Sequence, residues 1–244
     1  MTKMNTNSNS YTLMFATIMV VVVALVLAFV SGSLKEKQTK NVELDKKKQI
    51  LSSLNIDIED QDAEKLYAQY IQQELVIDYT GKVIESPKDK AFDIVIKKEL
   101  ARNLEDRALP LYVAEVEGQT KYIISLFGGG LWGPIWGYVS LNEDKNTIFG
   151  TYFSHASETP GLGSEIADKP FQNQFIGKKI MNDKMEFVSI AIMKAGQKTD
   201  LQDQVDGVSG GTITSKGVEN MLLNCIGQYE KFLQNNKLEE PGNE

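Results

Sequence analysis

Cysteine and histidine are almost missing from this sequence of 244 residues, which contains only Cys225 and His155. A single cysteine cannot form an internal disulfide, and the two residues together supply too few ligands for a zinc site or a histidine-rich metal site. No cysteine lies near the amino terminus, so a lipid-modified amino-terminal cysteine is not expected. We therefore predict no metal site, and any cofactor must be held by oxygen atoms, backbone groups and apolar contacts.

Positive charge is also scarce, because 26 Lys and Arg residues stand against 33 Asp and Glu residues, giving a net charge of -7. A net acidic chain without a basic stripe is a poor candidate for binding nucleic acid. The apolar fraction of 42% and the charged fraction of 24% are typical of globular proteins and exclude a disordered or collagen-like chain. The length allows one large domain or two small ones.

Charge is absent altogether from the run Tyr11–Val30. As a helix these 20 residues would span about 30 Å, the thickness of the bilayer core. The run is longer than the core of a signal peptide, which is about 7–15 residues, and no clear A-x-A cleavage site follows it. A buried core helix is the poorest interpretation, because nothing on the run is polar enough to face water. We predict an uncleaved transmembrane anchor within residues 1–31 and a linker or helix over residues 32–60.

The lysines near this anchor are distributed unevenly. Only Lys3 precedes it, whereas six lysines follow it up to Lys48. By the positive-inside rule, this count alone predicts that the carboxyl-terminal side is cytoplasmic. Without residues 1–31 the chain keeps 25 positive and 33 negative charges, so the part beyond the anchor is acidic, with a net charge of -8.

The remaining sequence predicts an α+β domain over residues 61–238, with an antiparallel sheet and flanking helices, and a tail at 239–244. Asp62 is expected to cap a helix that passes into an extended segment ending at Ile77. Val218–Leu233 belongs to an amphipathic helix of about 20 residues, with Cys225 on its buried face. Turns at Gly118 and at Asn142–Asn146 separate alternating runs that predict strands. These strands are Leu111–Val116, Tyr122–Phe127, Pro134–Leu141, Thr147–Phe153 and Phe187–Met193.

The segment Phe127–Gly133 contains G-x-G-x-x-G, which in a dinucleotide site must open a helix. An extended run follows instead, so we reject a Rossmann site. Both tryptophans of the chain, Trp132 and Trp136, flank this turn. From the residues alone, a strand-end turn packed by aromatics and a ligand site both remain open.

The segment His155–Gly163 gathers polar and glycine residues in one loop, which is typical either of a plain loop or of a binding loop. No serine or cysteine nucleophile stands in an elbow motif near it, so a hydrolase triad is not supported.

The segment Asp206–Ser215 reads DGVSGGTITS and lies directly before the amphipathic helix. It is not a Walker A loop. Thr214 or Ser215 is predicted to cap the helix. The same geometry could hold a phosphate on free N–H groups, but the helix dipole adds only about 0.3–1 kcal/mol. With Lys216 as the one adjacent cation, a reversible mononucleotide would lack charge partners, whereas a covalently attached one would not need them.

The run SGGT followed by ITSKGV resembles the flavinylation motif of FMN-binding domains, D-x-x-S/T-G-A-T followed by T-S. Asp206, Ser209, Gly210 and Thr212 match this pattern, and Gly211 stands where alanine is usual. The resemblance implies one FMN joined by a phosphoester to the side-chain oxygen of Thr212. ETPGLG, from Glu158 to Gly163, is the second signature of the family.

The run Gly130–Leu141 is similar to the C subunits of sodium-translocating NADH:quinone reductases and not to the G subunits of Rnf electron-transport complexes. This resemblance covers nearly the whole chain. It implies a subunit that relays electrons through FMN in a membrane complex that oxidises NADH, reduces ubiquinone and exports sodium, without binding NADH itself. Other subunits of the complex and a flavin transferase are the implied partners.

The resemblance also implies a single-pass protein of the bacterial inner membrane whose flavin domain lies on the periplasmic side. The lysine count points the other way. We follow the family, because the asymmetry involves few charges and long domains translocate largely regardless of charge.

By the same resemblance, the isoalloxazine ring lies between the ETPGLG loop and the LWG turn. Trp132 and Leu162 would supply flat apolar contact, Glu158 and Thr159 would hydrogen-bond the ring edge, and Lys216 with the backbone N–H groups of 216–218 would offset the phosphate charge. No residue is assigned as catalytic. The predicted cofactor-binding residues are Trp132, His155, Glu158, Thr159, Leu162, Gly163, Ser209, Gly210, Gly211, Thr212, Lys216, Gly217 and Val218.

Three alternatives stay open from the sequence. The first is an Rnf-type subunit or a stand-alone FMN electron carrier. The second is an anchored binding module without a redox role, and the third is a purely structural membrane-tethered protein. Flavin bound to the denatured protein would separate the first from the other two.

Overall fold

The structure is a computed structural model that describes residues 8–58, 62–85 and 90–235. The chain divides into two compact units, Met1–Lys46 and Lys47–Glu244. The predicted tail at 239–244 lies outside the described residues.

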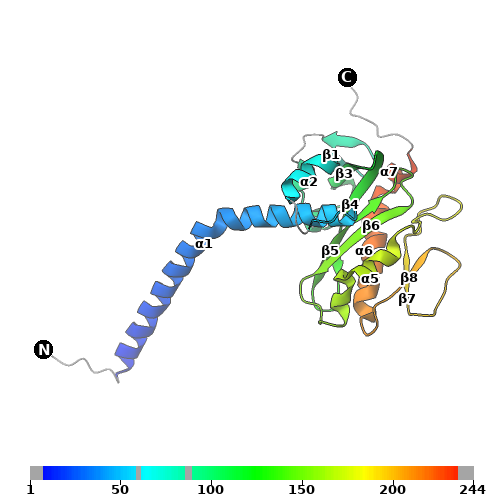
Figure 1. The fold of residues 1–244 in the computed structure, drawn as a ribbon. Helices are drawn as coiled ribbons and strands as arrows, with labels where there is room; N and C mark the ends of the chain where they lie inside the picture. Colours follow the sequence, from blue (N-terminus) through cyan, green and yellow to red (C-terminus); the bar gives the residue numbers. More distant parts are fainter. Residues whose placement is uncertain (1–7, 59–61, 86–89, 236–244) are drawn as a thin grey trace. The chain divides into compact units, whose positions relative to one another are not determined.

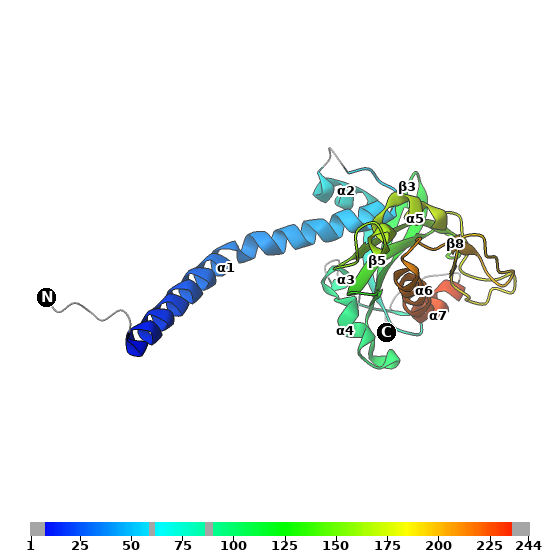
Figure 2. The same ribbon diagram turned by 90° about the horizontal axis from the view of Figure 1, so that it is seen from below.

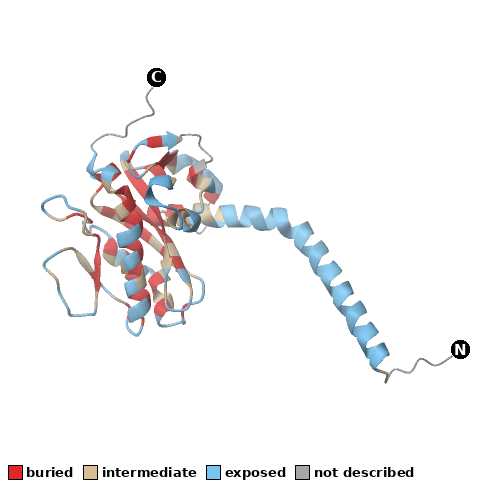
Figure 3. Cartoon of the chain, turned by 180° about the vertical axis from the view of Figure 1, so that it is seen from behind, coloured by how far each residue is buried: buried red, intermediate tan, exposed pale blue. Residues whose placement is uncertain are grey.

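The first unit contains most of helix α1 (Asn9–Ser53), which includes the whole uncharged run Tyr11–Val30. All side chains from residue 12 to residue 43 are exposed, as the pale blue of this helix shows in Figure 3. Within the described part of the chain, α1 is the one helix long and apolar enough to cross a membrane. An exposed apolar helix of this kind needs a nonaqueous surrounding, in agreement with the predicted anchor. The segment after the run is helical up to Ser53.

The second unit is built on one antiparallel sheet of six strands in the order β2-β1-β3-β4-β5-β6 (Figure 1). The strands are β1 (Ile71–Ile77), β2 (Val83–Glu85), β3 (Leu109–Val116), β4 (Gln119–Gly129), β5 (Pro134–Leu141) and β6 (Ile148–His155). The four predicted strands between residues 111 and 153 are confirmed as β3 to β6. Glu117 and Gly118 both have positive φ, 53° and 75°, so they form the tight hairpin turn that Gly118 indicated.

The two faces of the sheet have different partners. Leu111, Ile124 and Val139 are aligned across β3, β4 and β5 and belong to the core that packs against α6 (Thr212–Ile226). On the opposite face, the Ser140 hydroxyl donates to the Ser53 carbonyl at 2.6 Å, which fixes the end of α1 to the sheet. Helix α2 (Ala63–Tyr70) lies on this second face, so Figure 2 shows α2 and α6 on opposite sides of the sheet.

Smaller elements complete the unit. Asp62 caps α2 as predicted, because its side chain accepts the Glu64 N–H at 3.1 Å, and β1 follows α2 directly. The other elements are α3 (Lys90–Asp93), α4 (Ile96–Leu100), α5 (Lys169–Gln172), α7 (Glu230–Gln234), the parallel pair β7 (Ala191–Met193) and β8 (Gln204–Asp206), and short 3₁₀ helices at Leu104–Asp106, Gly163–Ala167, Asn173–Phe175 and Gly227–Tyr229.

Cys225 is fully buried on the sheet-facing side of α6, as predicted. Its Sγ lies 3.4 Å from both the N–H and the carbonyl oxygen of Phe127 in β4. Burial raises the pKa of the Cys225 thiol to about 11, although the Phe127 N–H and Arg107 counteract part of this rise. The thiol therefore acts as a small buried group that joins α6 to the sheet.

Two predicted elements are shorter than expected. The strand predicted over Phe187–Met193 exists only as β7, because Ser189 has a φ of 63° and the N–H groups of Val188 and Ser189 both donate to the Ile180 carbonyl. The long amphipathic helix is interrupted at Gly227 by a 3₁₀ turn before α7. The α+β class with an antiparallel sheet is confirmed.

Candidate functional site

Three loops meet at the amino-terminal end of α6. The first is the β4–β5 hairpin turn, closed by a hydrogen bond of 2.8 Å from the Gly130 N–H to the Gly133 carbonyl. The second is the loop of residues 156–162 after β6, and the third is the loop of residues 207–211 after β8. All three glycine-rich segments singled out by the sequence are therefore brought together. The G-x-G-x-x-G run forms a hairpin rather than a helix start, as expected.

Glu158 connects these loops. Its side chain is 4% exposed, and its Oε1 accepts the Trp132 N–H at 2.9 Å while its Oε2 accepts the Thr214 hydroxyl at 2.5 Å. Burial raises the pKa of Glu158, but the hydrogen bonds from Thr214 and Trp132, with His155 nearby, outweigh it and hold the pKa below its ordinary value. Glu158 is thus an ionised carboxylate that joins the aromatic turn to α6.

Glycines around this carboxylate leave no room for side chains. A Cβ on Gly163 would lie 2.5 Å from Thr214 Oγ1 and 2.6 Å from Glu158 Oε2. A Cβ on Gly130 would lie 2.5 Å from Glu158 Oε1. Gly161, with a φ of 74°, makes the turn that Pro160–Gly161 predicted. Gly130 and Gly163 are therefore explained by close packing around Glu158, and Gly161 by a left-handed turn.

A cavity of about 210 Å³ opens between the ETPGLG loop and the first turn of α6. Leu131, Leu162 and Ile213 give it apolar walls with exposed edges. Seven residues of the predicted site line it: Glu158, Thr159, Leu162, Gly163, Gly210, Gly211 and Thr212. Trp132 does not line this cavity but directly follows Leu131, which does, and its side chain is 66% exposed. A flat apolar group could lie against these walls.

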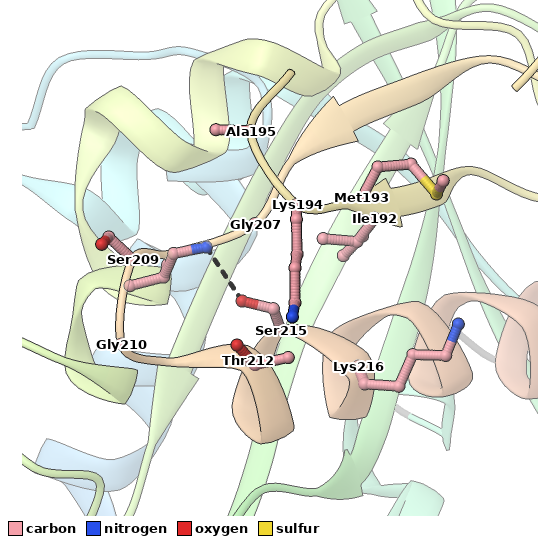
Figure 4. Close-up of a pocket in the computed structure, with 11 residues that line it drawn as sticks. Ile192, Met193, Lys194, Ala195, Gly207, Ser209, Gly210, Thr212, Ser215 and Lys216 are labelled. Atoms are coloured by element: carbon pink, nitrogen blue, oxygen red, sulfur yellow. Dashed lines mark hydrogen bonds between the residues drawn. The ribbon is translucent and has the colours of Figure 1, made fainter. Parts of the chain in front are cut away.

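A second cavity, of about 320 Å³, also has Thr212 in its lining (Figure 4). Ser209, Gly210, Thr212 and Lys216 line it, all of them predicted site residues. Ile192, Met193 and Lys194 also line it, although they were not predicted. They come from the short strand β7 and the residue after it, where no motif marks them.

Helix α6 begins earlier than predicted, at Thr212, with Gly211 in the capping position. The prediction that Thr214 or Ser215 caps the helix is wrong. Both hydroxyl groups instead form hydrogen bonds with residues outside the helix. Thr214 donates to Glu158, and Ser215 Oγ accepts the Val208 N–H at 2.9 Å. The N–H groups without an intrahelical acceptor therefore belong to residues 212–214 and not to residues 216–218.

The other predicted site residues have structural contacts. His155 Nδ1 accepts the Glu158 N–H at 3.2 Å, which shapes the start of the ETPGLG loop. Gly217 packs against the sheet, where a Cβ would lie 2.3 Å from the Gly129 carbonyl oxygen, and Val218 is fully buried. Lys216 Nζ forms an ion pair with Glu219, and Figure 4 shows its side chain projecting away from Thr212.

Comparison with known proteins gives one consistent answer. The FMN-binding domain family matches residues 130–227, which include all three loops. The chain is 35% identical to the C subunit of the Na(+)-translocating NADH-quinone reductase of Haemophilus ducreyi, with 93% of each chain covered. It is 31% identical to the same subunit of Neisseria meningitidis, with 98% of each covered.

Solved structures agree. The crystal structure of the corresponding C subunit from Parabacteroides distasonis aligns with a TM-score of 0.77 at 44% identity, covering 84% of this chain and 98% of that chain. NqrC of Shewanella oneidensis aligns with a TM-score of 0.66 at 26% identity, covering 79% of this chain and 97% of the other. Because these relatives match over most of their length, the chain belongs to the family of C subunits of the Na(+)-translocating NADH-quinone reductases.

Proposed function

We propose that this protein is the membrane-anchored flavoprotein subunit that relays electrons through one FMN within a Na(+)-translocating NADH:quinone reductase. The observation that carries this proposal is the position of Thr212. It is the first residue of α6, and it lines two cavities, one of which is also lined by residues of the ETPGLG loop. When bound, FMN supplies the electron chemistry, and the protein sets its position and surroundings.

The first turn of α6 carries three hydroxyl groups, and that of Thr212 is the exposed one. Thr214 is 1% exposed and donates to Glu158, and Ser215 is 3% exposed and accepts a backbone N–H. Thr212 is exposed, as is Gly210 two residues before it. This supports a phosphoester between Thr212 Oγ1 and the FMN phosphate, made by a flavin transferase.

The residues present fit such a group. We place the isoalloxazine ring in the cavity between Leu131, Leu162 and Ile213, with Trp132 at its edge. Thr159 and backbone groups of the loop would hydrogen-bond the edge of the ring. Glu158 would hold the loops around the ring in place, because its two oxygens already accept hydrogen bonds from Trp132 and Thr214. Lys216 would neutralise less of the phosphate charge than its place in the motif suggests, because it already forms an ion pair with Glu219.

NADH is proposed to bind to another subunit. The glycine run at 128–133 forms a β-hairpin, which lacks the helix amino terminus that holds a dinucleotide pyrophosphate. The chain itself would anchor in the bacterial inner membrane through α1, with the flavin domain on the periplasmic side. Its electron donor and acceptor would be the neighbouring carriers of the complex.

The test is the intact mass of the protein purified from its native host. Formation of the ester from Thr212 and FMN releases one water, so the expected excess over the sequence mass is one FMN minus one water. Fragmentation should place this excess on the peptide that contains Thr212. An unmodified mass, or an excess on another peptide, would contradict the proposal.

A further inference from the structure

The second cavity beside Thr212 contains a cation that belongs to none of the sequence motifs. Lys194 directly follows β7, and a hydrogen bond of 2.9 Å from the Gln197 N–H to the Lys194 carbonyl closes the turn behind it. Figure 4 shows its side chain pointing toward Ser215 and Thr212. No ion pair involves Lys194 within the part of the chain that the structure describes, whereas Lys216 is paired with Glu219. Lys194 is therefore available to a negative ligand in this cavity.

Ser215 supplies an independent sign of a ligand. It lines the same cavity and is 3% exposed. Its Oγ accepts the Val208 N–H, but its own O–H has no acceptor among residues 8–58, 62–85 and 90–235. A buried hydroxyl hydrogen without an acceptor is costly, so a group bearing acceptor oxygens is expected next to it.

We propose that Lys194 and the Ser215 hydroxyl form the subsite for the phosphoryl oxygens of the FMN on Thr212. This inference rests on the proposed function. A phosphate esterified both to the flavin side chain and to Thr212 has two free oxygens and one negative charge. Lys194 would balance that charge as a point cation, and Ser215 would donate to one oxygen. The free N–H groups in the first turn of α6 would add a weaker contribution.

The linings of the two cavities suit different parts of the FMN. Gly210 and Thr212 line both of them, so a group attached to Thr212 can reach into each. The cavity of about 210 Å³ has the apolar walls that suit the ring. The cavity of about 320 Å³ has the lysine and the two serines, Ser209 and Ser215, that suit the phosphoryl group.

The experiment compares Lys194→Gln with Lys198→Gln in the full-length, flavinylated protein. Lys198 is an exposed lysine of the same loop that lines neither cavity, so its substitution makes the same change in net charge. Two quantities are measured on each variant. They are the ³¹P resonance of the attached phosphate, and the gain in thermal midpoint over the same variant without FMN.

We expect Lys194→Gln to shift the ³¹P resonance and to reduce the gain in thermal midpoint by about 2–4 °C, the size of change expected from loss of one charged contact in a domain of this size. Lys198→Gln should change neither quantity, and Lys194→Arg should restore most of the midpoint. Failure of Lys194→Gln to accept FMN, with an unchanged midpoint before attachment and normal attachment in Lys198→Gln, also supports the subsite. Equal values for both glutamine variants would overturn it. A wild-type protein without covalent FMN would overturn the proposed function and this subsite together.

Discussion

Glu158 and Thr214 are 56 residues apart in the sequence, and their side chains meet at 2.5 Å, with the Thr214 hydroxyl donating to Glu158 Oε2. The other oxygen of the same carboxylate accepts the Trp132 N–H. One ionised group therefore joins the ETPGLG loop and the aromatic turn to the start of α6. A substitution in any of these three segments is therefore expected to change the geometry of the candidate flavin site.

The first prediction concerns the attachment residue. Thr212→Ala should abolish covalent FMN and leave a folded, colourless domain, because Thr212 is exposed and its substitution removes little buried surface. Thr214→Ala should keep the flavin but lose a hydrogen bond to a charged group, at a cost of about 1.5–3 kcal/mol of stability. Flavin fluorescence in a denaturing gel decides between them. A fluorescent Thr212→Ala band, or a dark band from soluble Thr214→Ala, would contradict the assignment.

The second prediction concerns pH. The pKa of Glu158 is lower in the folded protein than its ordinary value of 4.5, so its ionised form stabilises the fold above about that pH. This contribution is lost as the pH falls through the folded pKa. Glu158→Gln should therefore be less stable than wild type at pH 7, and the difference should shrink as the pH falls below 4.5. Denaturant unfolding of protein without FMN measures it. The exposed Glu143→Gln is the control, and a difference independent of pH would refute the role of the charge.

The third prediction concerns glycine packing. Gly163→Ala places a methyl group against Thr214 Oγ1 and Glu158 Oε2 and should cost about 1–3 kcal/mol through overpacking. Gly129→Ala is the matched control, because a Cβ there meets nothing within 4 Å and the backbone has no positive φ. The free energies of unfolding are compared in denaturant. Equal stability of the two variants would show that the loop adjusts freely around Glu158.

The fourth prediction concerns the ring. Trp132→Ala and Leu162→Ala should still carry covalent FMN, since neither residue touches the attachment chemistry, but the flavin absorption spectrum or reduction potential should change. Leu201→Ala is the control for loss of an exposed apolar side chain, because Leu201 is 81% exposed and lies outside both cavities. If both test variants match wild type in spectrum and potential, the ring lies elsewhere.

The fifth prediction concerns topology. A reporter protein that is active only outside the cytoplasm, fused after Glu244, should be active. The uncharged run within α1 motivates the single crossing, and the direction is the one proposed above for the flavin domain. Activity of a cytoplasmic reporter at the same position would instead support the direction given by the lysine count.

Local patterns predicted the parts of this fold that depend on local physics. Period-two alternation and short turns identified β3 to β6, and the helical repeat around Cys225 identified the buried face of α6. The predicted start of α6 was wrong because threonine and serine, the residue types at 214 and 215, are common capping residues. Their hydroxyl groups instead bond to Glu158 and Val208, partners that no local pattern reveals.

The candidate site shows the same division. The motifs identified seven of the residues that line the cavity beside the ETPGLG loop, because these seven lie in two short runs of the sequence, 158–163 and 210–212. They did not identify Lys194, which lines the same cavity as Thr212 and directly follows a strand of three residues. The strand predicted from Phe187 begins only at Ala191, because Ser189 has a left-handed backbone that its sequence context does not require. Tertiary packing decided each of these points.

The burial of Cys225 has a practical consequence for spectroscopy. The chain has no other cysteine, and a thiol with a pKa of about 11 inside the core stays protonated and out of reach of maleimide reagents at neutral pH. The wild-type protein therefore behaves as a natural blank for thiol labelling. A single cysteine introduced on the surface, for example at Lys198, would carry a spin label or dye while Cys225 stays in place. Distances from such a label to the flavin could then be measured in the assembled complex.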